Sequence, residues 1–332
     1  MKAVVVLLCS LSFLLSHGQF RQENVTVKKT LKLMGTRFEI TVVAPNEDIG
    51  YINIDEAVSE IQRIEKIISS WDENSETSLI NKNAGIAPVK VSPELFGLIE
   101  RAVKISEITD GAFDITYASM DNIWKFDGSM DSIPTEEQIK KELAKVGYEK
   151  IVLDPDTKTV FLPEPGMKIA FGAIGKGYAA DRAKELLVSK DVKGGIINAS
   201  GDLTTWGTKV TGEKWLVGIA NPLSKDKVFS WLPVIESSVA TSGNYEKFIT
   251  YKGKKYSHII DPRTGYPTTG INSVSIFAKQ AELCDALATA VFIMGKDVGL
   301  HMINQIDGVE AVVVDSDNKI HKSSGIMFDT NP

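Results

Sequence analysis

Cysteine and histidine are scarce in this chain of 332 residues, which contains two cysteines and four histidines. Cys9 lies in an apolar N-terminal segment, so removal of that segment would leave Cys284 alone and would exclude an intramolecular disulfide. A tetrahedral zinc site is also disfavoured, because its ligands are mainly thiolates and imidazoles. The fold must therefore be stabilised by its hydrophobic core, and about three hundred residues bury enough surface for one.

Positive charge is also in deficit, with a formal net charge of −6 at pH 7. A chain this acidic has no evident attraction for nucleic acids or for anionic lipid headgroups. We find no internal repeat and no low-complexity tract. Beyond the N-terminus, no apolar run is long enough to cross a bilayer.

The first nineteen residues, MKAVVVLLCSLSFLLSHGQ, combine a positive charge at Lys2 with a short apolar run and small residues at its end. This pattern is typical of a secretory signal peptide. We place cleavage after Gly18, which gives a signal peptide at 1–18 and a mature chain at 19–332. Loss of Lys2 then changes the net charge from −6 to −7. A lipid anchor at Cys9 is disfavoured, since Cys9 lies inside the apolar run, and we expect an exported protein.

Helices and short strands alternate irregularly along the chain. Apolar residues at three- and four-residue steps predict a helix over 53–70. Caps delimit two more, one from Ser92 to Gly111 and one that begins at Thr135 and stops at Gly147. Further helices are expected at 176–188, 281–294 and 298–305. Strands are expected where β-branched residues cluster, at 38–44, 150–153, 159–162, 194–199, 215–220, 273–278 and 310–315.

This order favours the α+β class, with mixed sheets and packed helices, over a doubly wound sheet. No Pro- or Ser-rich linker divides the chain. We therefore expect a single catalytic unit built of one or two lobes.

A glycine-rich stretch, FGAIGKGYAADRA, carries Gly172, Gly175 and Gly177 around the start of a predicted helix, with Lys176 in its first turn. Backbone amides at a helix N-terminus, joined by a lysine, suit a phosphate or pyrophosphate. The stretch is neither a Walker loop nor a dinucleotide-binding fingerprint. Tight packing at a strand–helix junction explains the glycines equally well, so both interpretations stay open.

Another helix, in AELCDALATAVFIMG, carries Asp285 and Thr289 one turn apart and therefore on one face. A carboxylate and a hydroxyl suit Mg²⁺ that keeps several waters and takes further ligands from substrate phosphates. On this helix alone, the alternative is favoured: an aspartate stabilised by the helix dipole and a threonine facing the core.

Other stretches offer rings and small residues. Trp71 lies among polar residues, which favours a stacking role over burial. Phe113 and Asp114 place a ring and a carboxylate in a loop after a helix, and Met34 is expected to open the first strand. The stretch INASGDLTTWG, with Asp202, allows close approach of a ligand or forms a simple turn.

In YSHIIDPRTGYP, His258 lies beside Asp261 and a Pro/Gly turn. A neutral imidazole is the side chain best suited to accept a proton near pH 7. The alternative is a structural histidine bonded to the turn, and the residues alone do not decide between the two.

Seven motifs occur in order between Met34 and Gly295: MGT, GAFDIT, GKGYAADRA, NASGD, ATSGNYEKF, SHIIDPRTGYP and DALATAVFIMG. Together they resemble the ApbE family of FAD:protein FMN transferases, over nearly the whole mature chain. The resemblance implies binding of FAD with Mg²⁺ and cleavage of the pyrophosphate. It also implies transfer of FMN, as a phosphoester, to a threonine or serine of another exported protein, with AMP released in the periplasm or at the membrane surface.

The resemblance also implies roles for individual residues. The metal ligands would be Asp285, Thr289 and the backbone carbonyls of Ala173 and Ala288. The FAD contacts would be Met34, Trp71, Ala112, Phe113, Asp114, Lys176 and Ile259. His258 would be the general base, and Asp261 would orient it or the turn beneath it.

This chain departs from the family pattern at Ala170 and Asn244, where relatives often carry acids. Acceptors in this chemistry carry a D-x-x-[S/T]-G-A-[T/S] motif, which this chain lacks, so it resembles the enzyme and not the substrate. Two alternatives remain: a Mg²⁺-dependent FAD pyrophosphatase that yields FMN and AMP, and an exported flavin-binding protein without turnover.

Overall fold

The computed structural model describes residues 24–120, 123–126, 130, 132–220, 228–234, 236–244, 248–251 and 254–327. The predicted signal peptide, its cleavage site and Cys9 lie outside these ranges. Within the described ranges, no helix has the length and apolar character needed to span a membrane.

An eight-stranded sheet forms the base of the molecule, in the order β1-β2-β6-β7-β10-β13-β14-β15. Its described strand pairs are all antiparallel. The strands are β1 (Val25–Leu33), β2 (Thr36–Ala44), β6 (Gly195–Ala199), β7 (Asp202–Trp206), β10 (Ser238–Gly243), β13 (Ile271–Ala278), β14 (Glu310–Asp315) and β15 (Ile320–Lys322).

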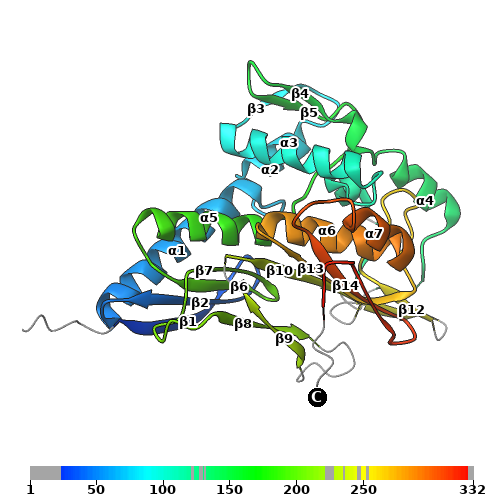
Figure 1. Ribbon diagram of the computed structural model, residues 1–332. Coiled ribbons are helices and arrows are strands. Elements are labelled where there is room, and N and C mark those ends of the chain that lie inside the picture. Colours follow the sequence, from blue (N-terminus) through cyan, green and yellow to red (C-terminus); the bar gives the residue numbers. More distant parts are fainter. Residues whose placement is uncertain are drawn as a thin grey trace, which may run out of the picture.

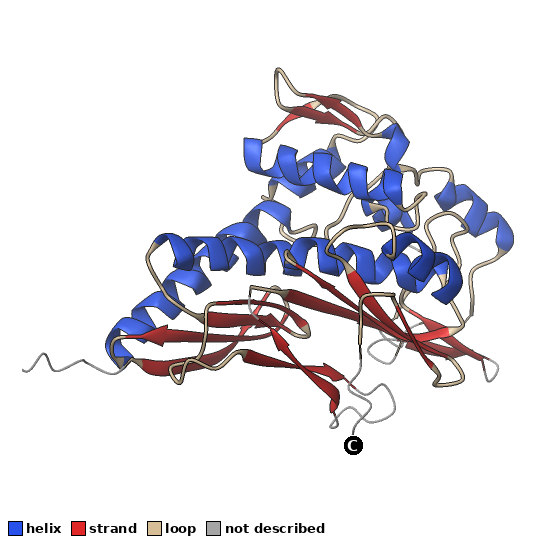
Figure 2. Ribbon diagram, viewed as in Figure 1, coloured by secondary structure: helices blue, strands red, loops and turns tan. Residues whose placement is uncertain are grey.

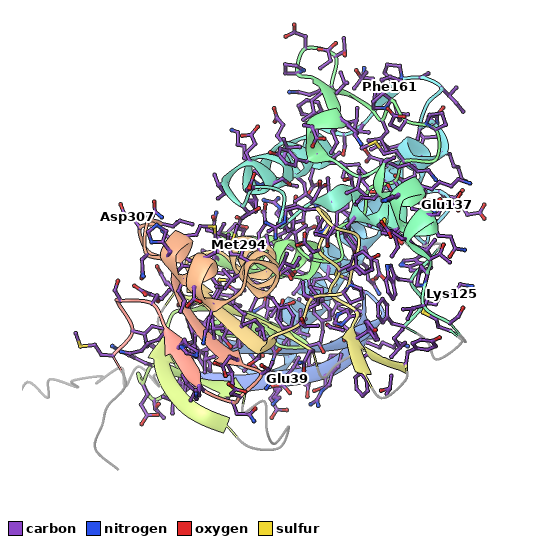
Figure 3. The ribbon with its side chains drawn as sticks, turned by 90° about the vertical axis from the view of Figure 1, so that its right-hand side faces the viewer. Glu39, Lys125, Glu137, Phe161, Met294 and Asp307 are labelled. Atoms are coloured by element: carbon purple, nitrogen blue, oxygen red, sulfur yellow. The ribbon has the colours of Figure 1, made fainter. Side chains whose placement is uncertain are left out.

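Helices cover one face of this sheet in two layers (Figure 1). The layer next to the sheet holds α1 (Glu47–Ile68), α5 (Gly175–Ser189), α6 (Ala281–Met294) and α7 (Lys296–Ile303). The outer layer holds α2 (Glu76–Lys82), α3 (Pro93–Ile108) and a small sheet of β3 (Val89–Lys90), β5 (Thr159–Phe161) and β4 (Val152–Asp154). In Figure 3, Glu39 marks the large sheet, Met294 the inner helices and Phe161 the small sheet.

Smaller elements complete the fold (Figure 2). They are the 3-10 helices η1 (Ile115–Met120) and η2 (Tyr148–Lys150), the helix α4 (Glu136–Leu143), and the hairpins β8 (Trp215–Ala220) with β9 (Val228–Val234) and β11 (Phe248–Tyr251) with β12 (Lys254–Ser257). The large sheet is covered on its helical face and on part of the other face. Its helical face carries the main core, and a second apolar cluster on Trp215 and Val217 of β8 covers Val239, Phe277 and Val312.

The α+β class is confirmed, and most predicted elements occur. Ser92 caps α3, the capping box of Thr135 and Gln138 begins α4, and α6 has the predicted bounds. The first helix begins earlier than predicted, at Glu47, where Asn46 caps it. The prediction missed β1, because its charged residues mask the alternation that buries Val27 and Leu33.

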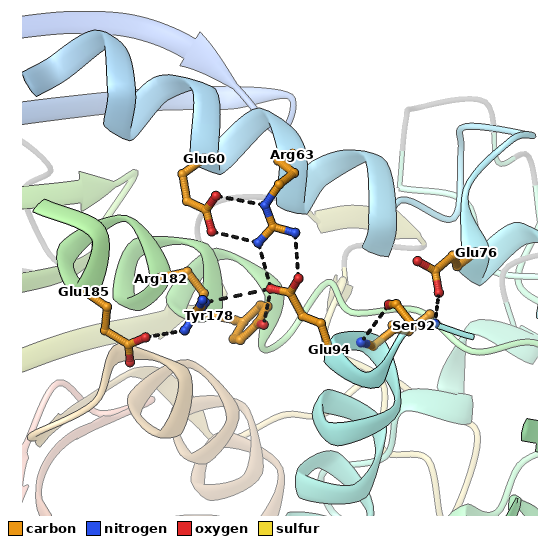
Figure 4. Close-up of polar contacts among 9 residues, drawn as sticks. Glu60, Arg63, Glu76, Ser92, Glu94, Tyr178, Arg182 and Glu185 are labelled. Carbon is orange, nitrogen blue, oxygen red and sulfur yellow. Dashed lines mark hydrogen bonds and ion pairs between the residues drawn. The ribbon is translucent and has the colours of Figure 1, made fainter. Parts of the chain in front are cut away.

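An ion-pair network fixes α3 against α1 and α5 (Figure 4). Arg63 of α1 donates to Glu94 of α3 at 2.6 and 2.9 Å, and the Tyr178 hydroxyl of α5 donates to the same carboxylate at 2.8 Å. The Arg63 guanidinium lowers the pKa of Glu94 despite its partial burial. The network therefore holds the outer layer of the fold on the helix that begins at Gly175.

The turn after β14 makes a pH-dependent contribution to the stability of the fold. Asp315 accepts hydrogen bonds from the backbone amides of Asp317 and Lys319, and its carboxylate lies 2.8 Å from His321 Nε2 and 3.2 Å from Lys296 Nζ. His321 and these donors lower the pKa of Asp315 below its ordinary value of about 4. A lowered carboxylate pKa adds stability above about pH 4, and this is lost as the pH falls towards the folded-state pKa.

We therefore expect Asp315→Asn to lower the melting temperature at pH 7 and to lose that effect progressively as the pH falls from about 4 towards the folded-state pKa of Asp315. Thermal unfolding of both proteins across this range measures it. Asp317→Asn, at an exposed residue of the same turn, is the matched control. A difference in melting temperature that does not change with pH would contradict the prediction.

Candidate functional site

The turn between β1 and β2 carries Met34. Leu33 pairs with Thr36, and the two residues between them, Met34 and Gly35, have φ of 48° and 73°. Positive φ at both central residues is the geometry of a type I′ hairpin, which matches the twist of its strands. Met34 therefore lies in the turn, where its backbone amide donates to Glu65 of α1 at 3.1 Å, instead of opening the first strand. Its side chain packs against the core beside Gly175, where α5 begins.

Half-buried Lys176 and two buried carboxylates form a cluster at the start of α5. Its ammonium donates to Asp202 of β7 and lies 3.5 Å from both carboxylate oxygens of Asp285 on α6. Both aspartates are 4% exposed. Burial and the nearby Asp202 carboxylate raise the pKa of Asp285. Burial alone would lower the pKa of Lys176, but the two neighbouring carboxylates outweigh it and raise that pKa. The cluster therefore holds two carboxylates and one cation.

Gly177 of this stretch allows close packing between α5 and α6. A Cβ atom on Gly177 would lie 2.1 Å from the carbonyl oxygen of Ala281, so only glycine fits this crossing of the two helices. The Gly177 amide donates to Asp285 at 3.2 Å. The close packing at Gly177 is therefore between two helices, and not at the strand–helix junction that the sequence suggested, and it brings Lys176 to the face of α6 that carries Asp285.

The remaining candidate metal ligands lie around the same two helices. Thr289 is one turn beyond Asp285 on α6, and its hydroxyl lies 3.4 Å from that of Ser242 on β10. Ala288 is buried on α6, and Ala173 lies two residues before α5 begins. Among the described residues, no group of three or more His, Cys, Asp or Glu side chains comes together. The available donors are carboxylate, hydroxyl and carbonyl oxygens, and this set suits Mg²⁺ that completes its shell with water and phosphate.

Trp71 lies in the loop between α1 and α2. It borders a hollow of about 340 Å³ on the outer layer. Its side chain is 92% exposed, and the hollow is also lined by Lys82, Ala118 and Lys168. One wall is rigid, because the Asn81 side chain bonds both the amide and the carbonyl of Ile169, at 2.8 and 3.0 Å. An exposed ring beside a preformed hollow can stack on a planar ligand.

Ala112, Phe113 and Asp114 lie beneath the surface. Ala112 and Phe113 are at most 2% exposed, and both belong to the main core. Asp114 accepts three hydrogen bonds, two from Thr116 at 2.7 Å and one from the amide of Tyr148 at 2.8 Å. Burial raises its pKa, and these bonds oppose the rise. The Asp114 carboxylate therefore holds the backbone around Thr116 and Tyr148 in place, and its hydrogen bonds are made inside the protein.

His258 follows β12 in a loop that leads into β13. Its ring is half-buried and meets the edge of Phe126, with 6.4 Å between ring centroids. Ile259 is buried, and its carbonyl accepts the amide and the hydroxyl of Thr268, at 2.9 and 3.0 Å. These bonds close the loop beneath His258.

Asp261 serves the turn of this loop. Its carboxylate binds the Arg263 side chain through two bonds of 2.9 Å, and its carbonyl accepts the Gly265 amide at 2.8 Å. Gly265 in turn accepts the indole N–H of Trp124 at 2.9 Å. Of the two roles expected for Asp261, these contacts correspond to support of the turn.

The match to known proteins covers most of this chain. The model of the ApbE family matches residues 34–313, which include every candidate site residue described above. The chain belongs to the ApbE family.

Relatives within the ApbE family agree in length and in fold. A protein of Treponema pallidum named FAD:protein FMN transferase is 31% identical over 289 residues, which cover 82% of this chain and 80% of that protein. One of the same name from Klebsiella pneumoniae is 32% identical over 266 residues, 80% of this chain and 82% of that protein. The crystal structure of the ApbE protein of Thermotoga maritima matches with a TM-score of 0.84 and 31% identity, over 90% of this chain and 97% of the other.

The two departures from the ApbE pattern have definite surroundings. The amide of Ala170 donates to the carbonyl of Ile115 at 3.0 Å. The side-chain amide of Asn244 donates to the carbonyl of Ile271 and to Asn272 Oδ1, both at 3.0 Å. The side chain of an aspartate has no N–H group and could not donate these two hydrogen bonds, so asparagine fits the local backbone.

The sequence did not indicate the contacts of two acidic residues around α5 and α6. The stretch that carries Asp202 was expected either to allow close approach of a ligand or to form a simple turn, and in the structure Asp202 binds Lys176. Asp181 of α5 accepts hydrogen bonds from the first two amides of α6. The available signal was spacing, since Asp181 lies one helical turn after Gly177 and so on the same face.

Proposed function

We propose that this enzyme transfers FMN from FAD to a serine or threonine hydroxyl of an exported acceptor protein, in a Mg²⁺-dependent reaction that releases AMP. The observation that carries the proposal is the cluster of Lys176 with the buried carboxylates of Asp202 and Asp285, in a chain whose ApbE relatives are named FAD:protein FMN transferases. A lysine and carboxylates at this point suit a pyrophosphate with a divalent cation.

In the proposed reaction, the acceptor oxygen forms a bond to the FMN phosphorus while the bond between phosphorus and the bridging oxygen breaks. AMP leaves with that oxygen. The hydroxyl proton passes to an imidazole nitrogen of His258, because a neutral alcohol is a weak nucleophile near pH 7. Support for this role comes from the half-buried ring on a loop closed by Thr268 and Asp261.

Asp285 and Thr289, with the carbonyls of Ala173 and Ala288, would hold the Mg²⁺. When bound, the ion would neutralise charge on the phosphate oxygens and orient them. The Lys176 ammonium would bind the pyrophosphate and would keep its contact with Asp202. The buried carboxylate pair, with only one lysine between its members, supports a second cation at this point.

FAD itself would lie between this cluster and the outer layer. Trp71 would stack on a ring of FAD beside its hollow, and Met34 would contact FAD near the start of α5. Ala112, Phe113 and Ile259 are buried, so they would shape the walls beneath the ligand. Asp114 would act by fixing its turn.

The acceptor would be an exported protein with a D-x-x-[S/T]-G-A-[T/S] segment. We infer export from the signal pattern at 1–18, and the mature catalytic domain would span 19–332, in the periplasm or at the membrane surface. Binding of both FAD and an acceptor peptide would then occur within one domain.

A single assay tests the function. The mature protein is incubated with FAD and Mg²⁺, with and without a peptide that bears the acceptor motif, and AMP and peptide mass are measured. We expect AMP release that depends on the peptide, with a mass gain of one FMN. AMP released equally without peptide would instead indicate a pyrophosphatase, and bound FAD without AMP would indicate a flavin carrier.

A further inference from the structure

The helices α5 and α6 both lack an N-terminal cap of their own. The residues before them, Ile174 and Gln280, make no side-chain hydrogen bond to the helix they precede. The first amides of a helix need acceptors, and an uncapped end buried in the protein is unfavourable. Ala281, the first residue of α6, is fully buried, so water cannot supply the acceptors there.

Each helix receives its acceptor from the other helix. The two oxygens of Asp181, on α5, accept the amides of Ala281 and Glu282 at 3.0 and 2.9 Å. In return, Asp285 on α6 accepts the amide of Gly177 on α5 at 3.2 Å. Gly177 and Asp181 lie one turn apart on α5, as Ala281 and Asp285 do on α6, so the helices run antiparallel and cap each other.

The backbones touch between these two caps, because Gly177 meets the carbonyl of Ala281 with no room for a Cβ atom. The Asp181 carboxylate binds two amides of the first turn of α6, and Gly177 packs against the carbonyl of the same turn. Together these contacts restrict sliding and fraying of that turn. Asp285 and Thr289 extend from the first two to three turns of α6. Their positions are therefore set by the same contacts.

We propose that Asp181 is a positioning residue that holds the first turn of α6, and with it Asp285 and Thr289, in place for a divalent cation. This inference rests on the metal site of the proposed function. Asp181 is 9% exposed and bonds only backbone amides of Ala281 and Glu282 in the contacts described, so it acts through the helix.

The test measures Mg²⁺ affinity by calorimetry on the mature protein, with and without FAD, beside its melting temperature. We expect Asp181→Ala to weaken Mg²⁺ binding by about 10-fold or more, the range typical of outer-shell partners of metal sites. Asp181→Asn keeps one acceptor oxygen, so it should fall between the wild type and Asp181→Ala. It also provides a folded variant if alanine is not tolerated.

The matched control is Asn46→Ala, which removes the cap of α1, where Asn46 Oδ1 accepts the amide of Ile49 at 2.9 Å. This variant should lose stability but keep the Mg²⁺ affinity of the wild type. Hydrogen exchange should increase at the starts of both α5 and α6 in Asp181→Ala, because the two caps are reciprocal.

Two results would overturn the inference. If both Asp181 variants lose stability but bind Mg²⁺ as the wild type does, Asp181 is only a cap. If the wild type itself does not bind Mg²⁺ in either condition, the proposed metal site fails and the inference fails with it. The wild-type titration separates these two cases.

Discussion

His258→Ala should reduce FMN transfer by about 10²- to 10⁴-fold, the usual contribution of a general base. The acceptor alcohol would then have to lose its proton to water. FAD affinity should remain close to that of the wild type, because the proposed role of the His258 ring is to accept the acceptor's proton, while the proposed FAD contacts are made by other residues. Transfer is measured by acceptor mass, and FAD binding by fluorescence titration.

The control for this variant is His301→Ala, which removes an exposed imidazole on α7. It should transfer FMN at the wild-type rate. His258→Gln provides a second arm, since glutamine can hydrogen-bond but does not accept a proton near pH 7. Transfer retained in both His258 variants would exclude His258 as the base.

Asp285→Asn should weaken Mg²⁺ binding by at least about 100-fold, since even outer-shell partners of metal ligands contribute about 10- to 100-fold. The metal-free protein should nevertheless stay folded. The pKa of Asp285 is raised by burial and by Asp202, which means that its ionised form costs stability above its unfolded-state pKa of about 4. A neutral asparagine of the same shape removes that cost.

Thermal unfolding with and without Mg²⁺ measures this effect, because a ligand that binds the folded state raises the melting temperature. We expect a rise in the wild type and none in Asp285→Asn. Glu282→Gln is the matched control on the same helix, where the carboxylate bonds Arg101 at 2.7 and 3.1 Å, away from the cluster. An equal rise in Asp285→Asn and the wild type would count against Asp285 as a ligand.

Local signals in the sequence were sufficient for elements with strong caps or strong periodicity. The caps of α3 and α4 depend on residues within one turn of each other, and the periodicity of α6 was sufficient to predict its bounds. The edge strand β1 was missed because its charged residues mask the alternation that buries Val27 and Leu33. The strands β7 and β10 were missed because they are short and rich in small and polar residues. A strand with charged or small residues is stabilised by its neighbours more than by its own propensity.

The candidate site shows the same division. Lys176, Asp285, Thr289 and His258 were singled out because each lies in a short motif whose chemistry can be read directly. Asp181 was not singled out, and Asp202 was named without its partner, because their contacts are made with residues 100 and 26 positions away. The buried hydrogen bonds of Asp114 likewise include one from the amide of Tyr148, which is 34 residues further along the chain.

By itself, the sequence determined the α+β class, the helix caps, the family resemblance and most of the residues that carry chemistry, since these depend on residue type and short spacing. The tertiary structure alone decided that Gly177 serves a helix crossing, that Asp202 binds Lys176, and that α5 and α6 cap each other. The physical reason is that hydrogen bonds and close backbone contacts are satisfied in space, between segments whose separation along the chain carries no signal.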